Sequence, residues 1–477
     1  MAENLEKAGD FVLDLAEIMT VTGKSAIITD HVVGITLYED IQSPLLTGTI
    51  NFNDNTNLKD LAPLLGQEIL KLKIRTPSMN KDDEIIESVF SLFNHTHSMN
   101  VNQNSTIHHY KFSSMEATED SRIKVSRAMT GAISSIVSSL VRNDLKSKKH
   151  INEEESVGIR NIIGTEESPL ALIQRLIGQS VSKKYGSPSY LFFENLEGFH
   201  FRSLESLYEQ APTQSFSQSS DGGYSTKLRG FTNVLEEFGA IRKLTAHTNT
   251  DSLAWSSNGG YASELITHDI FNKHITHHHP YNYFKSFDKE KHINSFHGKN
   301  QSPVHSKAAV DDNGSTLADF PSKTYLLPIS FVDEARSMDA HYTDVLGVSM
   351  GFTGYNPASW ITKRTSLMSN FDAITAEIEV DGNTVLRAGH MVEVNLAPIA
   401  LDKQQKKTKP DRFFNGAFLV RNIMHEFFDI KEGGKGSHIL RVSCVKDCIE
   451  ETLPSIDRSP EPKVFGTNKE EPKIICI

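Results

Sequence analysis

The chain has 477 residues and a formal net charge of −11, with 38% hydrophobic and 23% charged residues. One hydrophobic core rarely covers this length, so we expect about two to four domains. The acidic balance argues against a protein that wraps nucleic acid. No apolar run reaches membrane-spanning length, and the N-terminus lacks the pattern of a secretory signal, so we expect no membrane insertion.

The first part of the chain, residues 1–120, is predicted to be rich in β-strands. Short runs of Ile, Val, Leu, Phe and Thr are typical of strands, and they occupy residues 11–19, 31–41, 47–52, 68–75, 88–93 and 107–112. One short helix is expected over 57–65, capped by Asn55 and shortened by Pro63. Strands around one helix indicate a small barrel or sandwich.

Residues 121–372 are predicted to form an inserted mixed α/β region. Helical spacing of apolar residues predicts helices over 122–145 and 168–181, and Pro169 fits the first turn of the second. Strands at 190–193 and 199–201 flank a hairpin turn at Gly198. Three further features are expected: a polar loop over 210–225, a strand within 226–250 that would join the C-terminal barrel, and a helix from Ala358 onward.

Residues 373–452 return to strands, which are predicted at 373–380, 391–396, 418–425 and 439–445, with a polar loop over 401–410. The three cysteines, Cys444, Cys448 and Cys476, are too few for a disulfide scaffold and favour a reducing compartment. Cys444 lies in an alternating strand pattern and is expected as a buried thiol. The fold class is therefore α+β, predominantly β.

Residues 453–477 form a proline-containing tail that we expect to stay extended until it meets a partner. The tail ends in an apolar tip. The residues expected to bind a partner are Ile474, Ile475 and Ile477.

Catalytic motifs are nearly missing from the sequence. Gly23-Lys24-Ser25 looks like the end of a phosphate-binding loop, but the first glycine of that motif is replaced by Ile18. No HExxH pattern occurs, and the carboxylate pairs are expected on solvated faces. We therefore expect no enzyme activity, no catalytic residue and no cofactor.

A cluster of histidines in the middle of the chain is the strongest candidate for a metal site: His268, His274, His277, His278, His279, His292 and His297. The four candidates for metal ligands are His274, His277, His278 and His279. A solvent-exposed loop is the preferred interpretation, and a structural or catalytic metal site stays open. A metallopeptidase or peptidoglycan hydrolase of a phage tail is the alternative function.

Two segments resemble the central hub proteins of contractile phage-tail baseplates. The first runs from Ser168 through the hairpin 190–204, and the second covers 373–445, including Val420, His425 and Phe427. The hub region of type VI secretion spike proteins has the same fold. This resemblance implies two tail-tube-like β-barrels, the first near residues 1–120 and the second mainly in 373–452, with mixed α/β domains inserted between them.

The resemblance also implies a function. Such a hub is a homotrimer whose ring joins the hexameric tail tube to the trimeric central spike and contacts baseplate wedge proteins. DNA passes through it without specific binding, so an acidic or neutral lumen is expected. The protein would be part of the virion tail and would assemble in the host cytoplasm. A hub of a bacterial contractile injection particle is a further alternative.

Overall fold

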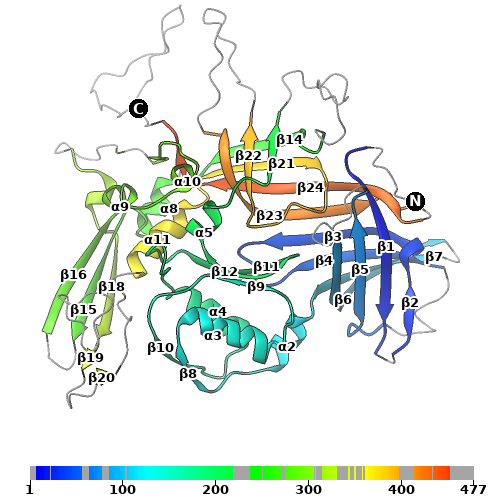
Figure 1. The fold of residues 1–477 in the computed structure, drawn as a ribbon, viewed down its shortest axis with the longest axis horizontal. Helices are drawn as coiled ribbons and strands as arrows, with labels where there is room; N and C mark the ends of the chain where they lie inside the picture. Colours follow the sequence, from blue (N-terminus) through cyan, green and yellow to red (C-terminus); the bar gives the residue numbers. More distant parts are fainter. Residues whose placement is uncertain are drawn as a thin grey trace, which may run out of the picture.

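The computed structural model describes residues 7–21, 23–55, 64–77, 85–102, 105–218, 237–249, 251–269, 274–305, 307, 314–329, 342–343, 349–350, 357, 360–396, 413–431 and 433–451. Within these ranges, no helix combines the length and hydrophobicity that a membrane crossing requires. Figure 1 shows a broad β-structure at the right and top, with smaller α/β parts below and at the left.

One sheet of thirteen strands dominates the molecule. Its strands are β1 (Asp10–Met19), β2 (Ser25–Ile27), β3 (Val32–Asp40), β4 (Thr47–Asp54), β5 (Ile69–Arg75), β6 (Ile86–Asn102), β7 (Ser105–Ser114), β13 (Gln214–Ser217), β14 (Ile241–Thr248), β21 (Ile374–Asp381), β22 (Met391–Asn395), β23 (Gly416–Phe428) and β24 (Lys435–Lys446). A 3-10 turn, η1 (Thr29–His31), precedes β3. The prediction of an α+β, predominantly β fold is confirmed.

Eight strands of this sheet close into a ring, in the order β23, β3, β4, β7, β6, β5, β1 and β24, because β24 pairs with β23. The ring encloses a core of alternating inward-facing residues that includes Phe11, Ile35, Phe52, Phe90 and Phe112. Apolar residues at every second position bury one face of each strand and leave the other to solvent. Two of the eight strands come from the C-terminal part of the chain.

The long strands β23 and β24 also belong to a second group of strands. The first residues of β23 pair with β22, and its later residues pair with β3. In the same way, β24 pairs with β1 at Ser437 and with β21 from Ile439 onward. The second group is β13, β22, β23, β24, β21 and β14, and a parallel bridge between Ser217 and Ala240 joins its two ends. Its core includes Phe216, Ile378 and Phe418.

The first inserted part lies below the sheet in Figure 1. Its elements are α2 (Glu116–Arg122), β8 (Ala128–Gly131), α3 (Ile133–Ser139), η3 (Leu140–Asp144), β9 (Ile151–Glu153), β10 (Arg160–Ile163), α4 (Pro169–Ile177), β11 (Tyr190–Asn195), β12 (Gly198–Ser203) and α5 (Leu204–Tyr208). The predicted second helix is confirmed, because Pro169 opens α4 and the Ser168 side chain caps it by accepting from Ala171 N. The predicted hairpin is also confirmed, with Gly198 at φ 135°.

The prediction of one helix over residues 122–145 is wrong in its first half. Val125 pairs with Glu167 in an extended bridge, and β8 pairs with β10 before the helix begins at Ile133. Helical turns then continue to Asp144. Tertiary pairing decided the conformation here, since Ile123 and Val125 also fit the two-residue period of a strand.

The second inserted part lies at the left of Figure 1 and contains a three-stranded sheet with short helices. Its elements are α8 (Ser252–Ser257), β15 (Ala262–Asp269), β16 (His274–Asn282), α9 (Tyr283–Phe287), α10 (Ile293–Phe296), β17 (Ser302–Pro303), η4 (Leu317–Asp319), β18 (Lys323–Ile329), β19 (Tyr342–Thr343), β20 (Ser349–Met350), α11 (Ile361–Asn370) and β25 (Cys448–Ile449). An aromatic cluster, with Trp255 stacked on His305 at 4.0 Å, forms its core.

Some of the other predictions concern residues that the structure describes, and some concern residues that it does not. The C-terminal strands, the helix α11 and the strand β14 within 226–250 are confirmed. The loop over 210–225 is wrong at Gln214–Ser217, which pairs in parallel with β22. The predicted helix over 57–65 falls mainly outside the described residues. The polar loop over 401–410 and the tail over 453–477 lie wholly outside them.

Candidate functional surface

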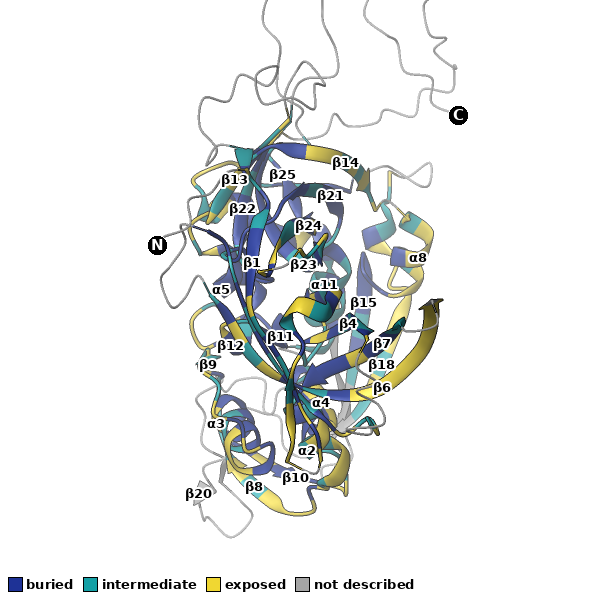
Figure 2. Cartoon of the chain, turned by 90° about the vertical axis from the view of Figure 1, so that its right-hand side faces the viewer, coloured by how far each residue is buried: buried dark blue, intermediate teal, exposed yellow. Residues whose placement is uncertain are grey.

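The thirteen-stranded sheet contains a continuous run of eight strands, which we call the eight-strand run: β14, β21, β24, β23, β3, β4, β7 and β6. Each neighbouring pair in this run is antiparallel. Figure 2 labels seven of these strands, from β14 at the top through β21, β24, β23, β4 and β7 to β6 at the lower right. The run therefore crosses from the second strand group into the eight-strand ring without a break.

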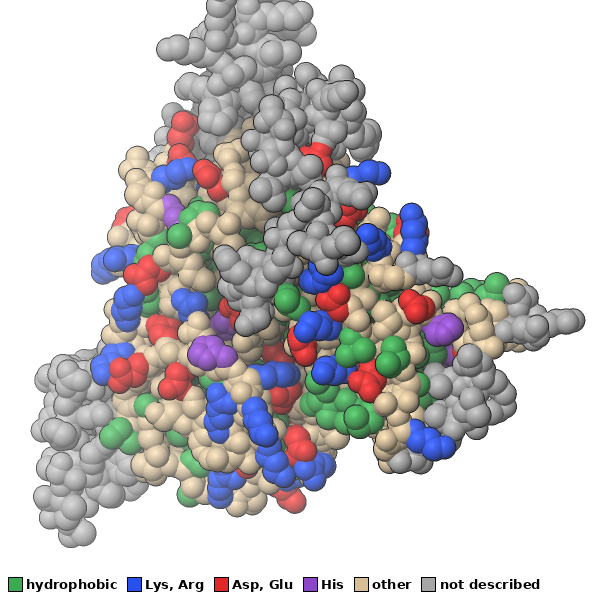
Figure 3. All heavy atoms as spheres, turned by 45° about the vertical axis from the view of Figure 1, so that its right-hand side comes forward, with side chains coloured by type: hydrophobic (Ala, Val, Ile, Leu, Met, Phe, Trp, Pro, Cys, Tyr) green, Lys and Arg blue, Asp and Glu red, His purple; other side chains and the backbone are tan. Residues whose placement is uncertain are grey.

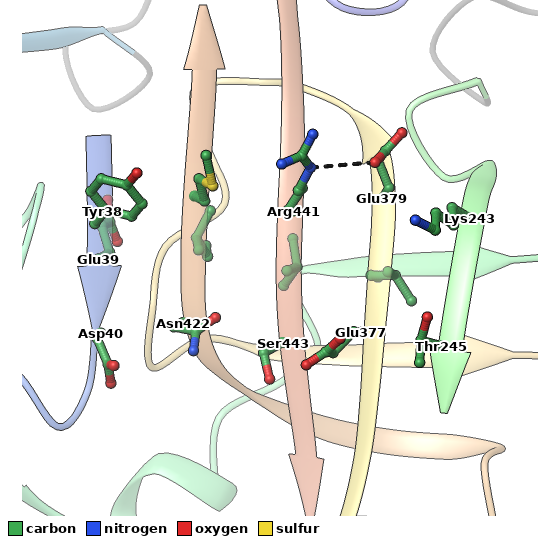
Figure 4. Close-up of a pocket in the computed structure, with 14 residues that line it drawn as sticks. Tyr38, Glu39, Asp40, Lys243, Thr245, Glu377, Glu379, Asn422, Arg441 and Ser443 are labelled. Carbon is green, nitrogen blue, oxygen red and sulfur yellow. Dashed lines mark hydrogen bonds and ion pairs between the residues drawn. The ribbon is translucent and has the colours of Figure 1, made fainter. Parts of the chain in front are cut away.

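A shallow hollow of 610 Å³ lies on the exposed face of the run, where β3, β23, β24, β21 and β14 adjoin. Figure 4 shows the polar side chains that line it. They come from alternate positions of each strand: Tyr38, Asp40, Asn422, Arg441, Ser443, Glu377, Glu379, Lys243 and Thr245. The intervening residues Ile378, Ile423 and Val442 are buried in the core behind the sheet. The pleat thus separates a polar face from an apolar one.

Charges of both signs are mixed on this face. Arg441 bridges two carboxylates, with its guanidinium 3.4 Å from Glu379 and 3.1 Å from Glu426. Burial raises the pKa of Asp40, against the Gln42 backbone hydrogen bond that lowers it. Figure 3 shows acidic and basic side chains interspersed over the side of the molecule that it draws. Such a face offers no concentrated positive charge to hold phosphates.

Behind the hollow lies a fully buried polar network, which we call the seam network because it sits where the two strand groups share β23 and β24. Glu39 accepts a hydrogen bond from Ala388 N at 2.8 Å, and its other oxygen lies 3.7 Å from His425 Nε2. His425 Nδ1 and His438 Nε2 are 3.2 Å apart. The side chains of Glu39 and His425 have no exposed surface.

The protonation of the seam network follows from burial and from Arg387. Burial raises the pKa of Glu39, but His425 and the Arg387 charge outweigh it and leave that pKa lowered. Burial lowers the pKa of His425 despite Glu39, and burial with the charges of His425 and Arg387 lowers that of His438 well below its usual range. These shifts favour neutral imidazoles and an ionised carboxylate.

A second buried pair has the geometry of a general-base dyad. His292 Nδ1 lies 2.8 Å from Asp447 Oδ2, and Ile293 N donates to Asp447 Oδ1. Burial lowers the pKa of His292, but Asp447 outweighs it and raises that pKa. The His292 ring stacks on Phe287 at 3.8 Å and is 1% exposed, so its free nitrogen faces packed protein instead of a cleft. This pair anchors α10 to the end of β24.

The structure places the four candidate metal ligands in β16, which pairs with β15. The expectation of a loop is therefore wrong: alternate residues in the segment satisfy a strand, and β15 supplies its pairing partner. Their side chains lie outside the description. Among the side chains that are described, no group of three or more His, Cys, Asp or Glu residues is placed to hold a metal.

The remaining predicted residues have different outcomes. Cys444 lies fully buried in β24, and burial raises the pKa of its thiol, so the expected buried thiol is confirmed. Ile474, Ile475 and Ile477 fall outside the described residues. Sequence reasoning missed the seam network, because its members lie far apart in the chain and only the strand order brings them together.

No protein-family model matches the sequence, and no curated protein matches it. Solved structures do. The 43 kDa tail protein of prophage MuSo2 from Shewanella oneidensis aligns over 92% of this chain and 99% of its own, with a TM-score of 0.50 and 10% identity. The tail protein from Neisseria meningitidis MC58 aligns over 92% and 98%, with a TM-score of 0.49 and 10% identity. The E. coli c3393 protein, a component of the type VI secretion system, aligns over 87% and 73%, with a TM-score of 0.39 and 9% identity.

At such low identity the similarity establishes the fold. The chain has the fold of a phage tail protein, and the resemblance to baseplate hub proteins is confirmed at that level.

Proposed function

We propose that this chain is the structural hub of a contractile phage-tail baseplate, in which three copies form a ring between the tail tube and the central spike. The observation that carries the proposal is the eight-strand run, a wide polar sheet face in a chain with the fold of a phage tail protein. Such a face suits the lining of a channel, because it neither binds a small ligand deeply nor packs into a hydrophobic core.

The charge of the face supports the passage of DNA through the ring. A channel for DNA should not hold phosphates, and the hollow combines Asp40, Glu377 and Glu379 with Lys243 and Arg441. The net charge of −11 adds a weak general repulsion. We place no catalytic step in this protein, and its partners are the tail tube protein, the central spike, baseplate wedge proteins and further copies of itself.

Domain assignments form part of the proposal. Residues 1–120 and 373–452 would supply the two tube-like barrels, residues 121–372 the insertions, and residues 453–477 a tail that docks Ile474, Ile475 and Ile477 on a partner. The protein would assemble in the host cytoplasm and remain in the virion tail.

The test is reconstitution with a tail tube protein and a central spike protein. We expect complexes that contain three copies of this chain by light scattering, and rings between tube and spike by electron microscopy. A chain that stays monomeric and binds neither protein would refute the proposal.

A further inference from the structure

Four histidines gather in the outer half of the β6–β7 hairpin, past the residues of β6 that pair with β5. They are His95 and His97 on β6 and His108 and His109 on β7. Residues 88–110 contain no Asp, Glu, Lys or Arg. The imidazoles are therefore the side chains of this stretch whose charge changes between about pH 5 and pH 8.

The histidines divide between the two faces of the hairpin. On one face, His95 and His108 share the Ser98 hydroxyl, which lies 2.8 Å from a nitrogen of each ring. His108 is buried, and its other ring nitrogen lies 3.6 Å from the Asp54 carboxylate. A proton on His108 would therefore gain a negative partner, so acid has little reason to disrupt this face.

His97 and His109 lie on the other face, and their surroundings are different. Their rings stack with centroids 4.0 Å apart and planes at 19°. His109 Nδ1 lies 2.6 Å from the Asn51 amide oxygen, and His109 Nε2 is buried without a hydrogen-bond partner among the described residues. Neither the amide nor the second imidazole supplies a negative charge to balance a proton.

The charged groups around the hairpin have other partners or the same sign. Asp54 faces His108, and the Glu68 carboxylate accepts hydrogen bonds from three backbone N–H groups. Lys111, two positions after His109 on β7, adds a positive charge to the same face. The other titratable groups described on the neighbouring elements pair with each other or line a hollow with Asn53: Lys71, Lys73, Glu87, Asp30, His31 and Asp429.

Acid should therefore separate the stacked rings. Burial lowers the pKa of His109, and the charges of His97, His108 and His95 lower it further. The closed hairpin thus binds fewer protons than an open one, in which His109 would have the ordinary histidine pKa of about 6.5. The stabilisation of the closed form is complete above that pH and is lost as the pH falls below it.

We propose that the stacked pair His97–His109 is an acid-sensitive switch, which holds the outer half of the β6–β7 hairpin closed at neutral pH and lets it open in acid. All residues from 93 to 101 are exposed, so this half can open locally while the eight-strand ring stays folded. The switch acts within one chain, and it stands whether or not three copies form a hub.

Hydrogen exchange of the full chain, measured by mass spectrometry at about pH 8 and about pH 5.5, tests the switch. EDTA is present so that no metal ion binds the imidazoles. After correction for the intrinsic pH dependence of amide exchange, residues 94–101 should lose protection about tenfold at the lower pH. One withheld proton favours opening by about this factor one pH unit below the ordinary histidine pKa.

Two variants of the histidines assign the effect. The double variant His97→Gln/His109→Gln removes both titrating rings, so the protection of residues 94–101 should change by less than about twofold between the two pH values. His438→Gln, in the seam network, should leave the tenfold loss in residues 94–101 as it is.

Asn51→Asp tests the switch while keeping both rings. It places a carboxylate where the amide oxygen lies 2.6 Å from His109 Nδ1, so a protonated imidazole would gain an ion pair. The acid-induced loss should shrink to about twofold or less. Asn100→Asp is the matched control, because it adds the same charge to the hairpin and still accepts a hydrogen bond from Thr106. It should keep the tenfold loss.

Three results would overturn the proposal. Residues 94–101 of the wild type could be equally protected at both pH values, or the double variant could lose protection as the wild type does. Asn51→Asp and Asn100→Asp could also behave alike. If the double variant does not fold, the comparison of these two aspartate variants decides.

Discussion

The Glu39 carboxylate accepts a hydrogen bond from the Ala388 backbone N–H at 2.8 Å, although 349 residues separate them in the chain. Both groups are buried where the eight-strand ring meets the second strand group. The bond therefore ties the loop before β22 to a strand from the first part of the chain. An ionised carboxylate in such a place is held by several partners together and not by one contact.

Replacing Glu39 by Ala should destabilise the chain strongly. The substitution leaves the Ala388 N–H without its acceptor and removes the carboxylate beside His425 and Arg387. We expect a loss of about 3 kcal/mol in the free energy of unfolding, measured by chemical denaturation. Glu377→Ala, on the exposed hollow, is the matched control and should change stability little. Equal effects of the two substitutions on the free energy of unfolding would show that Glu39 stabilises the chain no more than an exposed carboxylate does.

The seam histidines should make stability depend on pH. Burial lowers the pKa of His425 and, further, that of His438, so the unfolded imidazoles bind protons that the folded ones do not. Stability should be complete above about pH 6.5, the pKa of an unfolded histidine, and should fall as pH drops below it. The Arg387 charge lowers the pKa of both histidines and strengthens this pH dependence. The Glu39 carboxylate raises the pKa of His425 and weakens it. Denaturation curves at several pH values from 8 to 5 measure the slope.

The quantity to compare between variants is the slope of stability against pH, because each substitution also changes the stability itself. His438→Gln removes one titrating group and should flatten the pH dependence of unfolding between pH 7 and 5. Ile35→Val, a substitution without a titrating group in the core of the same ring, should lower stability and leave the slope as it is. A wild-type chain that is equally stable at pH 8 and pH 5 would contradict the prediction.

A half-buried lysine supports the contact between the first inserted part and the eight-strand ring. Lys149 Nζ lies 2.7 Å from Glu116 and 2.6 Å from Glu194, and Glu194 also accepts from Ser114 Oγ and Leu46 N. Lys149→Met would leave two buried carboxylates without their cation. We expect a loss of about 3 kcal/mol, and faster proteolysis within the insertion than in the ring.

The matched control for Lys149 is Lys183→Met, which removes an ion pair to Glu155 on the surface. Both partners of that pair are more than half exposed, so stability should not change measurably. If Lys149→Met is as stable as Lys183→Met, the inserted part does not depend on the Lys149 cation.

The sequence predicted strands well where burial follows a two-residue period. The strand β5, for example, alternates buried and half-buried residues along its whole length, as its sequence ILKLKIR implies. The end of β6 was missed, because residues 94–101 are exposed on both faces and their pattern of apolar residues carries no information about a core. The lack of charge from 88 to 110 was the available signal.

The ring closure was beyond prediction from one sequence. It depends on Phe427 lying opposite Ile35 and on Ser437 lying opposite Asp10, contacts between the two ends of the chain. Local propensity cannot specify partners across such a distance, since many strands have the same alternating pattern. The seam network follows from these pairings and was hidden for the same reason.

Gly48 in β4 should tolerate no side chain. A Cβ atom there would lie 2.4 Å from the Thr36 carbonyl oxygen and 2.3 Å from the Phe112 ring, so both the neighbouring strand and the core would have to move. We expect Gly48→Ala to cost about 2 kcal/mol in the free energy of unfolding. Gly178→Ala is the control, because Gly178 has helical φ and ψ and meets nothing closer than 3.5 Å. It should be neutral or stabilise by about 0.5 kcal/mol. A Gly48→Ala protein as stable as Gly178→Ala would mean that β3 and β4 are not packed as closely as described.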